Sequence, residues 1–308
     1  MSLLLQDITK KYDTQIAVNN IRFNVGFPEI VGFLGPNGAG KSTTLKMITG
    51  YLQPDQGTIE VCGMDISQHP IESRRKIGYL PESNPLYTDM YVREYLAFVA
   101  GLYQLREKQK RLNEVIELTG LGTEAHKKIG QLSKGFKQRV GLSAAIIHNP
   151  DVLILDEPTT GLDPNQIIEI RNVIQSLAET KTVLFSSHIL QEVEALCKRV
   201  IIINNGHIVA DDKLEQLKAA GSKNATVLLT IKQSIRADEL AQLIGMGAII
   251  KTGDQTFELA CDNPDIARKK IMEAALAHSL DILQLQTEEQ NLEQIFKSLT
   301  NYHTSNPS

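Results

Sequence analysis

The sequence is poor in several features that define whole classes of protein. Its 308 residues include three cysteines, which lie far apart at Cys62, Cys197 and Cys261. Their spacing fits neither a disulfide framework nor a metal-ligand set, which favours reduced thiols in a cytosolic compartment. No apolar run approaches the roughly 18 residues that a membrane-spanning helix needs. The chain is therefore not expected to cross a bilayer, and any membrane role must come through a partner.

The sequence also lacks targeting signals and charge bias. The N-terminus, Met-Ser-Leu-Leu-Leu-Gln-Asp, has neither the basic region nor the apolar length of a signal peptide. A net charge of -4 gives no general basic surface for nucleic acid. We find no internal repeat and no low-complexity tract. With 42% hydrophobic and 22% charged residues, the composition is that of a soluble globular protein of about two domains.

What the sequence does carry is a phosphate-binding loop. Residues 35–42, Gly-Pro-Asn-Gly-Ala-Gly-Lys-Ser, fit the pattern G-x-x-x-x-G-K-[ST]. An apolar run at 30–34 predicts a buried strand before the loop, and residues 43–50 predict a helix after it. Glycines let successive N–H groups turn toward one anion, and the helix adds its positive N-terminal end. Lys41 would reach the β- and γ-phosphates, and the Ser42 hydroxyl would hold Mg²⁺. The expected nucleotide-binding residues of the loop are Gly35, Pro36, Asn37, Gly38, Ala39, Gly40, Lys41, Ser42 and Thr43.

A second decisive stretch ends in two carboxylates. Residues 151–158 read Asp-Val-Leu-Ile-Leu-Asp-Glu-Pro, so Asp156 and Glu157 follow four apolar residues of a buried strand. Ligands collect at the C-terminal ends of such strands in open α/β sheets. A later apolar strand, 182–187, ends at His188. The alternation of strands and helices predicts a mostly parallel α/β sheet.

The remaining patterns predict smaller parts around this core. Short strands at 3–5, 17–18, 21–25 and 58–62 suggest a small antiparallel sheet, with Tyr12 in a turn. Apolar spacing near 3.6 predicts helices over 91–103 and 107–118, within a helical subdomain of about 83–150. We therefore expect a nucleotide-binding domain over 1–213 and a linker over 214–224. The order βαββαβ over 225–300 predicts a small ferredoxin-like domain, and residues 301–308 a disordered tail.

These segments together resemble a known family. The phosphate loop, the stretch Leu-Ser-Lys-Gly-Phe-Lys-Gln-Arg at 132–139, the two carboxylates, Gly-Leu-Asp-Pro at 161–164 and the strand-end histidine occur in the order found in ATP-binding subunits of ABC transporters. The resemblance covers residues 1 to about 212. Segments 78–87 and 91–98 look like the gliding-motility-associated branch, among the drug- and sodium-export ATPases. The resemblance implies an α/β P-loop NTPase core of the ABC type, with antiparallel β and helical subdomains beside a C-terminal α+β domain.

The resemblance also implies roles for individual residues. Tyr12 matches the aromatic that stacks on adenine, and Asp156 matches the carboxylate that holds Mg²⁺. Glu157 resembles the general base that polarises water, with Lys41 at the phosphates, and His188 resembles the sensor of the γ-phosphate. Phosphoryl transfer needs this combination of charge neutralisation, positioning and a water-orienting group. The implied reaction is Mg²⁺-dependent ATP hydrolysis.

The stretch at 132–135 resembles the family's signature loop, which contacts the nucleotide of a partner subunit. Ser133 and Gly135 would touch that γ-phosphate, and Asp163 would couple the two sites. The implied assembly is a head-to-tail homodimer or heterodimer with two ATP molecules between the subunits. Lys134 stands where the family usually has a second glycine, and Phe136 where it has glutamine.

One more residue departs from the family's usual pattern. Glu82 stands at a position that is usually glutamine; it could ligate Mg²⁺ but adds a negative charge near the phosphates.

Three functions remain open. The first is an ATPase that powers a separate membrane permease from the inner face of the cell membrane, with residues 83–130 as the docking face. The second is a soluble, non-transport ABC ATPase acting on nucleic acid or ribosomes. The segment between Lys41 and Ser133 is too short for the coiled coil of DNA-repair members, and the chain has one cassette rather than two, so no direct nucleic acid contact is expected. The third is a binding module whose C-terminal domain senses a ligand.

Overall fold

The computed structural model describes residues 2–222, 225–247, 249–253, 255–261, 263–288 and 292–301. By their internal contacts the residues divide into two units, Met1–Asp212 and Lys213–Ser308. Of the tail expected over 301–308, Asn301 is instead the last residue of a helix, and 302–308 lie outside the described residues.

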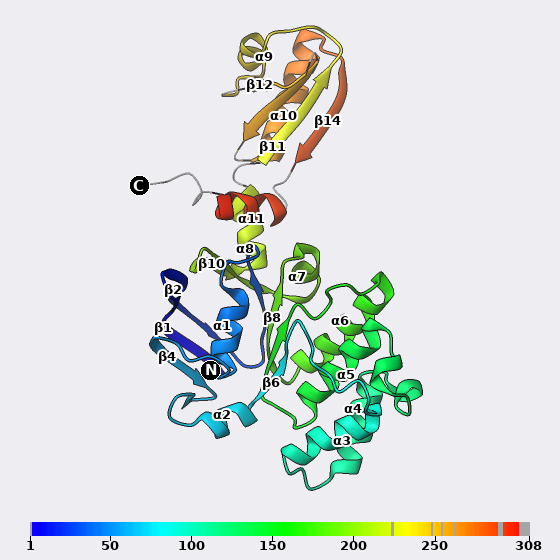
Figure 1. The fold of residues 1–308 in the computed structure, drawn as a ribbon. Helices are drawn as coiled ribbons and strands as arrows, with labels where there is room; N and C mark the ends of the chain where they lie inside the picture. The colour runs from blue at the N-terminus through cyan, green and yellow to red at the C-terminus, as the bar shows by residue number, and fades with distance from the viewer. Residues whose placement is uncertain are drawn as a thin grey trace. The chain divides into compact units, whose positions relative to one another are not determined.

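A six-stranded sheet forms the centre of the first unit, in the order β10-β9-β3-β8-β7-β6 (Figure 1). Strands β9, β3, β8, β7 and β6 pair in parallel, so the predicted mostly parallel sheet is confirmed. Every residue of β7 and β8 is buried, as in a sheet covered on both faces. The strands are β3 (Ile30–Leu34), β6 (Ile77–Leu80), β7 (Val152–Asp156), β8 (Thr182–Ser187), β9 (Arg199–Asn204) and β10 (His207–Lys213).

An antiparallel sheet of order β2-β1-β4-β5 lies beside this core. The antiparallel sheet expected here is confirmed, but two of its strands, β1 (Leu3–Tyr12) and β2 (Gln15–Val25), are longer than predicted. Register shifts within their pairing absorb the polar residues that interrupt the apolar alternation. Tyr12 accordingly ends β1 rather than lying in a turn. The other strands are β4 (Gln56–Val61) and β5 (Met64–Asp65), and α1 (Lys41–Ile48) contacts both β2 and β7.

Helices α3, α4 and α5 form the helical part of the first unit around an apolar cluster of their own. The two predicted helices are confirmed as α3 (Val92–Leu102) and α4 (Lys108–Leu118). Short 3-10 turns at Gly122–Glu124 and Ile129–Gln131 lead to α5. The remaining helices of this unit are α2 (Pro70–Arg75), which the sequence analysis missed, α5 (Lys134–Ile146), α6 (Pro164–Ala178) and α7 (Leu190–Leu196).

The second unit has the strand order β12-β13-β11-β14, with antiparallel pairing between neighbours. This order is that of a βαββαβ ferredoxin-like sheet. The elements are β11 (Ala225–Ile231), α9 (Ala237–Ile244), β12 (Ile249–Lys251), β13 (Thr256–Cys261), α10 (Pro264–His278), β14 (Ile282–Glu288) and α11 (Leu292–Asn301). Within the stretch expected as a linker, 214–224, Leu214–Ser222 form helix α8. Leu214 and Leu217 are buried one turn apart, and α8 packs on α11.

Candidate nucleotide site

The phosphate loop connects β3 to α1 and depends on two glycine conformations. Gly38 has φ 79° and Gly40 has φ 110°, in the region that side chains disfavour. A β-carbon on Gly40 would also lie 2.6 Å from the carbonyl oxygen of Ala17. Larger residues are therefore excluded at Gly40 by both torsion and space. The turn ends in an α1 N-terminus capped at Gly40, where free N–H groups can face an anion.

Lys41 holds its ammonium at the mouth of this loop. The residue is 7% exposed, and its Nζ donates to the carbonyl oxygens of Gly35 at 2.7 Å and Pro36 at 3.2 Å. Burial lowers the pKa of Lys41, and the carboxylates of Glu157, Asp156 and Glu82 oppose that change. The site thus sets one cation against three acids.

Asp156 ends β7 and connects three elements of the core. It is 2% exposed, and the Ser186 hydroxyl of β8 donates to its Oδ1 at 3.0 Å. Burial raises the pKa of Asp156, and hydrogen bonds from Ser186 and from Ser42 of α1 counter the rise. The effect of Ser42 on this pKa indicates that the Asp156 carboxyl lies near the first turn after the phosphate loop.

Glu157 projects from the next position in a strained backbone conformation. Its φ is 51°, and a non-glycine residue in such a region costs of the order of 1–3 kcal/mol. Its N–H donates to the Ser186 carbonyl at 3.1 Å. Its Oε2 lies 2.7 Å from His188 Nδ1 and accepts from Thr160 Oγ1 at 3.3 Å. Burial raises the pKa of Glu157, and the His188 contact opposes this.

These groups surround a cavity of about 380 Å³. Its lining joins residues from the phosphate loop, from the loops after β6 and β7, and from the end of β8. It consists of Ala17, Asn37, Gly38, Gly40, Lys41, Ser42, Thr43, Glu82, Glu157 and His188. Tyr12 does not line it and is 47% exposed at the end of β1, with Lys10 Nζ 6.0 Å from its ring centroid. Gly35, Pro36, Ala39 and Asp156 are not among the lining residues, although the carbonyl oxygens of Gly35 and Pro36 accept hydrogen bonds from Lys41.

The signature-loop residues form a second cluster that does not line this cavity. Ser133 is exposed and caps α5, with its Oγ accepting from the Phe136 N–H at 3.4 Å. Asp163 caps α6, with Oδ1 accepting from the Gln166 N–H at 3.0 Å. A β-carbon on Gly135 would lie 2.4 Å from Gln166 Oε1, so the two helix starts pack closely.

The residues at the two departures in this loop also make contacts. The Lys134 ammonium lies against Gly161, where a β-carbon would meet it. The Phe136 ring packs under the Arg139 guanidinium, 5.4 Å from its centroid. Both substituted side chains therefore help to fix the signature loop within its own chain.

The oxygen donors near the phosphate loop fit a hard divalent cation. Within the described ranges no three His, Cys, Asp or Glu side chains gather closely enough to hold a metal alone. The Ser42 hydroxyl lies close enough to the Asp156 carboxyl to lower its pKa, and Ser42 and Glu82 line the same cavity. Magnesium typically takes one or two carboxylates and completes its shell with water and phosphate oxygens. The donor set therefore suits Mg²⁺ on a bound nucleotide.

Sequence reasoning missed several residues that hold the site together. Ala17 lines the cavity, Ser186 binds Asp156, and Thr160 binds Glu157. The signal for Ser186 was present, because two serines end an otherwise apolar strand directly before His188. Nothing local to Ala17 or Thr160 marks them.

The fold and this site define an ATP-binding cassette. The family model described as ABC transporter matches residues 18–160. The chain is 36% identical over 298 residues to the uncharacterized ABC transporter ATP-binding protein YxlF of Bacillus subtilis, covering 96% of this chain and 98% of that protein. It is also 36% identical to the linearmycin resistance ATP-binding protein LnrL of Bacillus subtilis, covering 97% and 98%. The chain therefore belongs to the ATP-binding proteins of ABC transporters, and it is an ATPase.

A solved structure shows the same fold as a dimer. It is a dimeric post-hydrolysis state of an ATP-binding cassette bound to ADP and Pi, 26% identical, with a TM-score of 0.64. The match covers 69% of this chain and 98% of that one. In the described part of the present chain, no helix has the length and apolar content needed to cross a membrane.

Proposed function

We propose that the protein is the ATP-driven subunit of an exporter, which works as a head-to-tail dimer on a separate membrane permease. The observation that carries the proposal is that Lys41, Glu157 and His188 line the same cavity. In that cavity Lys41 neutralises the phosphates, and Glu157 orients the attacking water. His188 holds the Glu157 carboxylate through its Nδ1 and presents the rest of its ring to the γ-phosphate.

Mg²⁺ would be held by Ser42 and Asp156, with Glu82 at the cavity wall. The ion supplies charge neutralisation on the phosphates when bound. Tyr12, half-exposed at the end of β1, is free to stack on adenine. Its exposed ring supports that role, since an aromatic side chain can stack on a base.

The position of the signature loop supports the dimer. Ser133 is exposed at the start of α5 and does not line its own chain's cavity. A second subunit could bring its nucleotide to this serine, to the Gly135 backbone and to Asp163. The dimeric cassette described above shows that related chains pair in the presence of nucleotide products.

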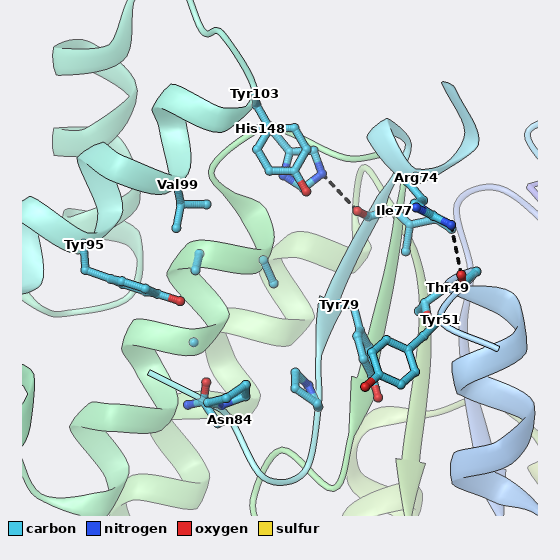
Figure 2. A pocket seen from close by; sticks show the side chains of 16 residues that line it. Thr49, Tyr51, Arg74, Ile77, Tyr79, Asn84, Tyr95, Val99, Tyr103 and His148 are labelled. Carbon is cyan, nitrogen blue, oxygen red and sulfur yellow. Dashed lines mark hydrogen bonds between the residues drawn. The ribbon is translucent and has the colours of Figure 1, made fainter. Parts of the chain in front are cut away.

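The docking face for the permease is the groove in Figure 2, which we call the tyrosine groove. It measures about 540 Å³, and its lining includes Tyr51, Tyr79, Tyr95 and Tyr103. Beside it α3 exposes Leu102 by 64%. Aromatic and aliphatic side chains in a concave site are what a partner segment buries most favourably.

The tyrosine groove is connected to the nucleotide cavity by one short loop. Pro81, Asn84 and Pro85 line the groove, while Glu82 of the same loop lines the nucleotide cavity. A permease segment in the groove would therefore contact the chain one residue away from a proposed Mg²⁺ ligand. The protein would sit in the cytoplasm, at the inner face of the membrane. The likeness to the linearmycin resistance protein LnrL supports a role in resistance, which export would provide, and a gliding-motility role stays a prediction that the relatives named here do not address.

Glu157→Gln tests the catalytic part of the proposal. The variant should bind ATP and dimerise but hydrolyse ATP at least about a hundredfold more slowly, as expected for loss of a general base. Glu179→Gln, at an exposed position after α6, is the matched control and should keep normal turnover. Near-normal turnover in Glu157→Gln would show that another group orients the water.

Co-purification from membranes tests the transport part. The full chain should bring down a protein with several membrane spans, and Leu102→Asp should weaken that association. Leu276→Asp, at an exposed position on α10, should leave it unchanged. Recovery of ribosomes or nucleic acid in place of a membrane protein would favour the non-transport function instead.

A further inference from the structure

A buried carboxylate lies behind the catalytic residues and has no role in the scheme above. Glu192 is on α7 and is 1% exposed, although it has no cation as a partner among the described salt bridges. The packing of α7 against the sheet does not need it, because Val193 and Leu196 supply buried apolar side chains on the same helix. A carboxylate in such a place is costly unless hydrogen bonds compensate for its lost hydration.

The Glu192 side chain makes two hydrogen bonds, and both go to residues next to the site. Its Oε2 accepts from Thr159 Oγ1 at 2.5 Å and from Ser187 Oγ at 3.1 Å. Thr159 is two residues after Glu157, and Ser187 directly precedes His188. The Ser187 hydroxyl oxygen in turn accepts from the Ile189 N–H at 3.0 Å, just after His188. One carboxylate oxygen thus joins the two segments that carry the catalytic pair.

The second carboxylate oxygen of Glu192 shows that burying this side chain is energetically costly. Glu192 Oε1 is buried and has no hydrogen-bond partner in the described chain. An unsatisfied buried acceptor destabilises the fold, so the site retains a group that an apolar residue would replace at lower cost. Meanwhile the direct link between Glu157 and His188 is one contact of 2.7 Å, made by a histidine whose side chain is 46% exposed. That contact depends on the spacing of the two loops beneath it.

We propose that Glu192 is a positioning residue for ATP hydrolysis: by accepting from Thr159 and Ser187, it fixes the distance between the Glu157 loop and the His188 loop. This inference rests on the proposed roles of Glu157 and His188. Glu192 touches neither nucleotide nor water in this scheme. It acts by holding the carboxylate and the imidazole in register, where small misplacements have large effects on rate.

Substitutions at Glu192 separate acceptor function from packing. Glu192→Leu has a similar volume but no acceptor, so kcat should fall by roughly 10- to 100-fold, the scale of a displacement of about 1 Å. The KM for ATP should change by less than about twofold, because the phosphate loop keeps its contacts. Glu192→Gln can still present a carbonyl oxygen to both hydroxyls, so it should recover kcat to within a few-fold of the wild type. Gln191→Leu, an exposed neighbour on α7, is the control and should behave as the wild type.

The two hydroxyls give an independent test if Glu192→Leu fails to fold. Thr159→Val and Ser187→Ala should each lower kcat without raising KM. Thr159→Val combined with Glu192→Leu should be no slower than Glu192→Leu alone, since both changes break one network. A kcat within about twofold of wild type in Glu192→Leu, or in both hydroxyl variants, would overturn the inference. If Glu157→Gln is inactive in the same assays the proposed function survives that result; if Glu157→Gln is active, the proposed function itself fails.

Discussion

Gly141 tests how the loop that carries Glu82 is attached to α5, the helix that follows the signature loop. It lies inside α5, and a β-carbon there would be 2.3 Å from Oδ1 of Asn84. Asn84 belongs to the loop after β6, and its Nδ2 donates to the Lys137 carbonyl of α5 at 2.9 Å. Gly141→Ala must therefore push Asn84 away from the helix or shift the helix itself.

The expected magnitude follows from three opposing terms. Alanine favours a helix over glycine by roughly 1 kcal/mol. Loss of the Asn84 hydrogen bond costs about 1 kcal/mol, and overpacking a filled site costs about 1–3 kcal/mol. The net loss in free energy of unfolding is roughly 1–3 kcal/mol, which lowers Tm by about 2 to 12 °C in a domain of this size. A helix-favouring substitution is thus expected to destabilise the protein.

Circular dichroism melts can measure this, since the chain has no tryptophan for fluorescence. Asn84→Ala is the matched background, because it removes the side chain that the new methyl would strike. In that background Gly141→Ala should raise Tm by about 2–4 °C, the helix-propensity term alone. A Gly141→Ala protein that melts at or above the wild type, or a double variant no more stable than Gly141→Ala, would refute the reasoning.

Three further outcomes are expected. Lys41→Ala should weaken ATP binding by about 10- to 100-fold in equilibrium titrations, the value of a charge-assisted hydrogen bond, and unchanged affinity would argue against its phosphate contact. Glu82→Gln should alter the Mg²⁺ dependence of ATPase activity by removing one negative charge from the cavity, and identical Mg²⁺ titrations would count against Glu82 as a metal neighbour. Burial lowers the pKa of His148 from 6.5 to about 4, so its contribution to stability is present above pH 6.5 and is lost as the pH falls toward 4. The difference in Tm between the wild type and His148→Gln should therefore narrow over that range, and a constant difference would contradict the assignment.

The parts of the site that the sequence predicted are those written in consecutive residues. The phosphate loop, the Asp156–Glu157 pair and His188 each follow an apolar strand, and strand ends in a parallel sheet converge at one edge. The βαββαβ order likewise predicted the second unit. The sequence predicted a linker over 214–224, whereas Leu214–Ser222 form a helix in which Leu214 and Leu217 are buried.

What the sequence could not predict are contacts between segments that lie far apart along the chain. The bonds of Glu192 to Thr159 and the approach of Asn84 to Gly141 join residues 33 or more positions apart. The sequence around Glu192 and around Gly141 does not indicate these contacts. A glutamate on a short helix normally faces solvent, and a glycine in a helix interior normally indicates a less stable helix. Packing at these places overrides propensity, and only the three-dimensional arrangement reveals it.

Helix α5 connects the loop beside the tyrosine groove to Ser133, and its contact with α6 extends this connection to Asp163. Asn84 binds the middle of α5, and Ser133 caps its start. Farther along α5, Arg139 donates to the Thr119 carbonyl at 3.1 Å and pairs with Glu169 of α6, the helix whose start Asp163 caps. Packed helices move as units rather than bending continuously. A partner that displaced the Asn84 loop would therefore be expected to move Ser133 together with Asp163, so that docking at the groove and closure on a neighbour's nucleotide would be one motion.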